Sequence, residues 1–118
     1  MFKVVSTQTR PNSEVEFYTS MDDSEESVDF RMHWLLNYVD TIKVIEVTRE
    51  LSQDLLTLTT TIVWKDENTH LEAFQDPIFA AMIERRNAYN QQYGITVGID
   101  KFTILSGQTD FTPVPNRN

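Results

Sequence analysis

The sequence contains no cysteine, and its 118 residues include only three glycines and two histidines. The lack of cysteine excludes disulfides, thiolate metal ligands and cysteine nucleophiles, and it fits a reducing compartment. We therefore expect a cytoplasmic protein. Phosphate-binding loops need a glycine-rich turn before a helix, and no glycine here is so placed. The sequence thus argues against nucleotide-dependent transfer.

Long apolar runs and positive charge are scarce as well. No segment approaches 18 consecutive apolar residues, and the apolar stretch at the start is too short for a signal peptide. We expect a protein that is neither secreted nor embedded in a membrane. Ten Lys and Arg residues stand against 18 Asp and Glu residues, which gives a net charge of −8. Because nucleic-acid binding depends largely on cationic side chains, we expect no nucleic-acid partner.

The chain shows no internal repeat and no break in composition, which predicts one domain. We place this domain at residues 1–105 and an extended C-terminal tail at residues 106–118. The tail contains two prolines, and Phe111 and Val114 would let it lie across a neighbouring subunit. A domain of this length buries about two-thirds of its unfolded surface, so a core can form without a metal or a disulfide.

Apolar periodicity predicts the order strand, helix, strand, strand, helix pair, strand. The four strands are expected at residues 2–8, 42–49, 55–64 and 96–105, which are rich in β-branched side chains. Within residues 55–64, alternate positions form a leucine-rich face and a threonine-rich face. The element order predicts an α+β, ferredoxin-like βαββαβ sandwich with a four-stranded antiparallel sheet. Its helices would cover one face, and the other face is expected to be too apolar to stay in water.

The first helix is expected at residues 24–39, with Asp23 as its N-cap and Glu26 three residues later. An apolar face toward the core is expected from the i, i+4, i+7, i+8, i+11 spacing of Val28, Met32, Leu35, Leu36 and Val39. A second line on its flank consists of Phe30, Trp34 and Tyr38. This line suits a widened core, a subunit contact or the stacking of a ligand.

Cap signals place two more helices after residue 65. Thr69 and Glu72 have the spacing of a capping box, and Asp76-Pro77 is a cap followed by proline at the first helical position. Gly94 is placed to end the longer helix with a positive φ. Gly98 is expected to form a bulge in the last strand.

Residue types that carry catalysis are few. His33 and His70 could each exchange protons near neutral pH if they face a cavity, but we expect both to have packing or surface roles. No histidine or carboxylate spacing is typical of a metal site, so we expect no bound metal. No serine lies in a nucleophile elbow, which leaves hydrolase chemistry without support.

One stretch resembles a known group of proteins. Residues 61–67, Thr-Ile-Val-Trp-Lys-Asp-Glu, are followed by residues 71–77, Leu-Glu-Ala-Phe-Gln-Asp-Pro, and by Phe79. This pattern resembles the dimeric α+β barrel superfamily, which includes the antibiotic-biosynthesis monooxygenase-like proteins. There, a strand ends in tryptophan, an acidic loop opens a short helix, and an Asp-Pro-like step bends into a longer helix. The resemblance implies a homodimer whose two sheets form a barrel, with a pocket between sheet and helices in each subunit.

The resemblance also implies roles for single residues. Trp64 is similar to a pocket tryptophan of cofactor-independent monooxygenases, and Arg85 or Arg86 to an arginine on the long helix. Those enzymes carry an asparagine where this chain has Thr60. Haem-degrading members bind iron through a histidine on the long helix, whose place here is taken by Met82 or Ile83. Because that histidine is missing, we expect no haem. We expect no other cofactor either.

The predicted ligand-binding residues are Trp34, Trp64, Phe79, Met82 and Arg86, with Arg86 able to hold an anionic oxygen. We expect a homodimer that binds a small apolar or aromatic molecule, with monooxygenase-like activity as the resemblance implies. In the alternative, these residues are only core, Arg86 pairs with a glutamate at the dimer edge, and the chain is a non-catalytic dimerisation or accessory protein. A connected cavity of roughly 300 Å³ or more beside Trp64 would favour the first hypothesis.

Overall fold

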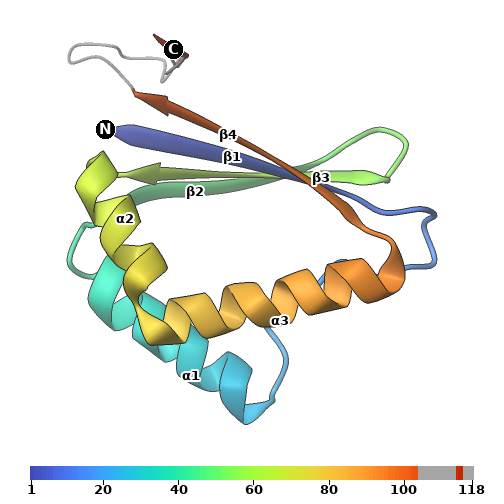
Figure 1. Ribbon diagram of the computed structural model, residues 1–118, viewed down its shortest axis with the longest axis horizontal. Coiled ribbons are helices and arrows are strands. Elements are labelled where there is room, and N and C mark those ends of the chain that lie inside the picture. Colours follow the sequence, from blue (N-terminus) through green and yellow to red (C-terminus); the bar gives the residue numbers. More distant parts are fainter. Residues whose placement is uncertain (104–113, 116–118) are drawn as a thin grey trace.

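The computed structural model describes residues 1–103 and 114–115. Its elements are β1 (Phe2–Thr9), α1 (Glu25–Trp34), the π-helix η1 (Leu35–Val39), β2 (Val44–Leu51), β3 (Thr57–Trp64), α2 (Glu67–Gln75), α3 (Pro77–Tyr93), β4 (Thr96–Thr103) and β5 (Val114–Pro115). The sheet is antiparallel with strand order β2-β3-β1-β4-β5. All helices lie on one face of it (Figure 1). The predicted ferredoxin-like α+β fold is confirmed.

Strand β1 pairs without interruption with both of its neighbours. Its pairing with β3 runs from Phe2 opposite Trp64 to Thr9 opposite Thr57. Its pairing with β4 runs from Phe2 opposite Thr103 to Thr9 opposite Thr96. The bulge predicted at Gly98 is therefore wrong. Gly98 lies directly opposite Thr7, and a Cβ at Gly98 would be 2.9 Å from the Oγ1 of Thr7. Glycine is needed there because the threonine side chain approaches the neighbouring backbone closely.

The two faces of the sheet differ in composition. Directly paired residues point to the same side, so the register places Leu51 and Leu58 together under the helices. The open face carries a group of threonines, which are Thr7, Thr9, Thr48, Thr57, Thr59, Thr61 and Thr96. Its apolar members are Val5, Val63 and Phe102. The leucine-rich face expected within residues 55–64 is therefore the covered one, and the threonine-rich face is the open one.

Two helix caps differ from the predicted ones. Ser24, not Asp23, caps α1, and its hydroxyl accepts a hydrogen bond from the backbone N–H of Ser27. Asp66, not Thr69, caps α2, and its carboxylate accepts from the backbone N–H of Thr69 at 2.8 Å. In both cases an oxygen-bearing side chain one residue before the helix reaches the amide three residues on.

The side of α1 that faces the core is also not the predicted one. The five aliphatic residues of the predicted apolar face are 37 to 57% exposed: Val28, Met32, Leu35, Leu36 and Val39. The aromatic line packs inward instead, with Tyr38 only 5% exposed and with Phe30 and Trp34 against the core cluster. Each large ring buries more apolar area than an aliphatic side chain does, and all three rings pack against the core cluster.

The bend between α2 and α3 forms as predicted. The Asp76 carboxylate accepts a hydrogen bond from the backbone N–H of Ile78 at 3.0 Å, and Pro77 is the first residue of α3. At the other end of α3, Gly94 has φ 71, and the Ile95 N–H reaches the Asn90 carbonyl at 2.9 Å. These contacts satisfy backbone groups at both ends of the helix.

The last strand was predicted to run to residue 105, and β4 is described to Thr103. Val114 and Pro115 pair with Thr103 and Phe102 of the same chain. Residues 104–113 and 116–118 lie outside the described residues, and so does the proposed contact through Phe111. Within the described ranges, no helix is long and apolar enough to cross a membrane.

Candidate functional site

A cavity of about 600 Å³ lies between the helices and the covered face of the sheet. Its floor is formed by residues of three adjacent strands: Val47 and Arg49 of β2, Leu58, Thr60 and Ile62 of β3, and Ser6 and Gln8 of β1. Its opposite wall comes from Phe30, Arg31, Trp34 and Leu35 of the first helix and from Phe79, Met82 and Arg86 of α3. Residues 17–21 of the connector after β1 complete the lining.

One end of the cavity is aromatic. The rings of Trp34 and Phe79 are stacked with centroids 5.8 Å apart, and Phe30 lies 6.1 Å from Trp34 and 6.0 Å from Phe79. Trp64 stands behind this wall at 5.8 Å from Trp34 and is 1% exposed. This end offers broad apolar surfaces of fixed orientation, which suit a flat apolar ligand.

The other end is polar. Arg49 lies opposite Thr60, and Thr60 lies opposite Ser6, so these three side chains form one row across the floor. Gln8, two residues beyond Ser6 on the same face of β1, accepts a hydrogen bond from the Asn90 side chain at 3.3 Å. The floor therefore offers hydroxyl and amide groups to one part of a ligand.

Arg86 brings a positive charge to the wall. It is half-buried, and its Nε is buried without a hydrogen-bond partner. Burial lowers the pKa of Arg86, and only a weaker interaction with Tyr18 acts in the opposite direction. An arginine stays protonated in proteins even so, and the site therefore keeps a cation.

The structure brings together four of the five predicted ligand-binding residues. Trp34, Phe79, Met82 and Arg86 line the cavity, whereas Trp64 packs one layer behind it. Of the two arginines that the resemblance offered, Arg86 is the one in the cavity. Lining residues that the sequence did not suggest include Phe17, Tyr18, Gln8 and Arg49. Alternation along β1 would have found Gln8, but the connector has no periodicity that could reveal Phe17 and Tyr18.

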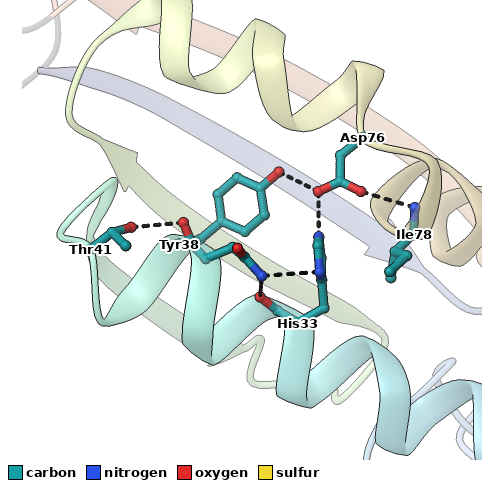
Figure 2. A network of polar contacts seen from close by, with 6 residues as sticks. His33, Tyr38, Thr41, Asp76 and Ile78 are labelled. Carbon is teal, nitrogen blue, oxygen red and sulfur yellow. Dashed lines mark hydrogen bonds and ion pairs between the residues drawn. The ribbon is translucent and has the colours of Figure 1, made fainter.

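His33 belongs to a polar network at the bend between α2 and α3 (Figure 2). Its Nε2 pairs with Oδ2 of Asp76, and the Tyr38 hydroxyl donates to the same oxygen at 2.6 Å. Burial raises the pKa of Asp76, but hydrogen bonds from His33 and Tyr38 outweigh burial and hold it below its usual value. None of the three residues lines the cavity, so the network ties the first helix to the bend.

His70 is packed inside the core. It is 1% exposed, with its ring 4.3 Å from Phe74 and 5.3 Å from both Phe2 and Trp64. Burial, with a smaller contribution from Lys101, lowers the pKa of His70 to about 4. The imidazole is therefore neutral at pH 7 and away from the cavity. Among residues 1–103 and 114–115, no three His, Asp or Glu side chains are grouped as metal ligands.

Comparison with known proteins finds similarity in structure only. No protein-family model and no curated protein matches the sequence. A candidate antibiotic biosynthesis monooxygenase from Deinococcus radiodurans has a similar crystal structure, with TM-score 0.54 and 10% identity over 92% of this chain and 97% of that one. A dimeric ferredoxin-like protein from an uncultured marine organism is similar with TM-score 0.51 and 11% identity, over 92% of this chain and 97% of that one. At 10% and 11% identity, these likenesses confirm the predicted resemblance in fold.

Proposed function

We propose that this protein binds a small, largely apolar or aromatic molecule in the cavity between its helices and its sheet. The observation that carries the proposal is the cavity itself. Protein interiors are normally close-packed, with few voids larger than a water molecule. An aromatic-walled space of about 600 Å³ inside a chain of 118 residues falls in the size range of small-molecule sites.

Calorimetric titration with two aromatic probes of one shape, naphthalene-2-carboxamide and naphthalene-2-carboxylate, tests this function. We expect saturable binding of at least one probe with one site per chain. Thr60→Phe, which places a ring on the cavity floor, should remove that binding, whereas Gln91→Phe on the exposed side of α3 should preserve it. If neither probe binds the unchanged protein saturably, the proposal fails.

We infer that the working form is a homodimer joined through the open face of the sheet. No described helix covers this face, and one of the structurally similar proteins is described as dimeric. Two sheets can pack face to face about 10 Å apart, and a threonine-rich surface suits a partly hydrated contact. Light scattering should give twice the chain mass. Thr59→Arg in the centre of this face should yield monomers, and Gln91→Arg should not; a monomeric unchanged protein at micromolar concentration would rule the dimer out.

Cofactor-independent oxygenation is the reaction to test in this cavity, because a structurally similar protein is a candidate monooxygenase. The cavity supplies aromatic walls and a cation, and Thr60 supplies a hydroxyl on the floor. Oxygen uptake with 1,4-dihydroxynaphthalene, compared between the unchanged protein and Thr60→Phe, separates an oxygenase from a non-catalytic binding protein. Binding without protein-dependent uptake would assign the chain to the second class.

A further inference from the structure

The charges around the cavity have one sign. Arg31, Arg49 and Arg86 line it, and none of its lining residues is an aspartate or glutamate. The chain as a whole has 18 acidic and ten basic residues, so this cavity is a cationic site in an anionic protein. Such a reversal of sign makes the cavity attractive to anions and selects against cations.

Among the described residues, none of these three arginines forms an ion pair. Arg31 donates to the carbonyl oxygens of Ser20 and Asp22, each at 2.7 Å, and thereby holds the connector. In the described part of the chain, the only ion pair is that of His33 with Asp76, so Arg49 and Arg86 are unpaired there. Arg49 is exposed at the rim, but Arg86 is half-buried with a buried Nε. A cation in such surroundings is costly unless an anion joins it.

The unpaired cation lies at one end of a polarity gradient. Along α3, Phe79, Met82 and Arg86 succeed one another on the face that lines the cavity. The sheet under the cavity also becomes more polar toward Arg86. Val4 lies opposite Ile62 at the apolar end, and Gln8 lies opposite Leu58 at the polar end. Asn90, one turn beyond Arg86, contacts Gln8. The cavity is thus apolar near Phe79 and polar near Arg86.

We propose that the ligand of this cavity is an aromatic anion, whose carboxylate or similar group lies against Arg86 and whose ring lies against Trp34 and Phe79. This inference rests on the proposed ligand-binding function and names the class of ligand. The guanidinium presents several N–H donors in a planar fork that matches a carboxylate. A bound anion would supply the partner that the buried Nε lacks.

Three probes of one size test the ligand class by calorimetry at pH 7: naphthalene-2-carboxylate, the neutral naphthalene-2-carboxamide, and the cationic 2-naphthylmethylammonium. A charge-assisted pair with Arg86 should make the carboxylate bind at least about tenfold more tightly than the amide. The cation should bind more weakly than both. Arg86→Met should remove the preference for the carboxylate while leaving the affinity for the amide within about threefold. Lys65→Met, an exposed site with the same change of net charge, should leave all three affinities unchanged.

A second measurement covers the case in which a variant binds poorly for structural reasons. Because Arg86 is unpaired in the described chain, Arg86→Met should have a higher melting temperature than the unchanged protein without ligand. Naphthalene-2-carboxylate should raise the melting temperature of the unchanged protein by more than that of Arg86→Met. Equal binding of carboxylate and amide would overturn the anion inference and leave the binding function standing. Failure of all probes would overturn both.

Discussion

Replacing Asp76 by alanine should destabilise the protein more than an average surface substitution. The carboxylate accepts hydrogen bonds from the Tyr38 hydroxyl at 2.6 Å, from His33, and from the Ile78 N–H at 3.0 Å. Loss of an N-cap costs about 1 kcal/mol. Tyr38 is 5% exposed, and a buried hydroxyl left without its partner costs about 1 to 3 kcal/mol. We therefore expect Asp76→Ala to lower the free energy of unfolding by about 2 to 4 kcal/mol.

Urea unfolding at pH 7 measures this loss. Tyr38→Phe keeps the ring and removes only the hydroxyl, so it is the matched variant. In that background Asp76→Ala should cost less than in the unchanged protein, because no hydroxyl is left unsatisfied. A loss below about 1 kcal/mol for Asp76→Ala, or strict additivity of the two substitutions, would refute the account of the network.

The same network predicts that the free energy of unfolding depends on pH. Hydrogen bonds hold the pKa of Asp76 below its usual value despite burial, so the folded state favours the charged carboxylate. The resulting stabilisation is fully present above the unfolded pKa of about 3.9 and is lost as pH falls through the lower folded pKa. The difference in unfolding free energy between the unchanged protein and Asp76→Ala should therefore narrow below about pH 4.

Two further substitutions test the packing. Gly98→Ala should lower the melting temperature, because its Cβ would lie 2.9 Å from the Oγ1 of Thr7. In a Thr7→Ala background the decrease in melting temperature should be smaller. An equal decrease in both backgrounds would contradict the explanation from the strand register. His70 has a pKa of about 4 in the folded state, below its ordinary value of about 6.5, so the unfolded chain takes up the proton first and stability should fall as pH drops from 6.5 toward 4. In His70→Phe the urea midpoint should change less between pH 7 and pH 5 than in the unchanged protein. An equal change in both proteins would argue against a buried neutral imidazole.

The order of elements could be predicted because each strand and helix carries its own local signal. Alternation of leucine with threonine in residues 55–64, and the Asp76-Pro77 step, report backbone geometry directly. The side of α1 that packs inward could not be predicted in the same way. Both the aliphatic stripe and the aromatic line fit a helical period, and tertiary contacts with Trp64 and Phe79 decide between them.

The candidate site was predictable in part for a similar reason. Phe79, Met82 and Arg86 share one helical face. Placing any one of them in the cavity therefore predicts that the other two line it as well. Tyr18 comes from a connector without periodicity, and its place beside Arg86 follows only from how the chain folds back. Arg49 gave no signal by itself, because its position on the cavity side depends on the irregularity between Val44 and Glu46 in β2.

The wide turn of η1 ends the first helix and sets the direction of Tyr38 within it. The Asp40 N–H reaches the Leu35 carbonyl at 2.8 Å, five residues back, so this turn holds one residue more than an α-helical turn. Deleting Asn37, which precedes Tyr38 in this turn, would restore ordinary α-helical spacing and rotate Tyr38 by about 100° relative to the residues before it. Tyr38 would then swing away from Asp76 and from the core. The hydroxyl contact of Tyr38 with Asp76 thus depends on a single additional residue in this turn, which is a matter of chain length rather than of side-chain chemistry.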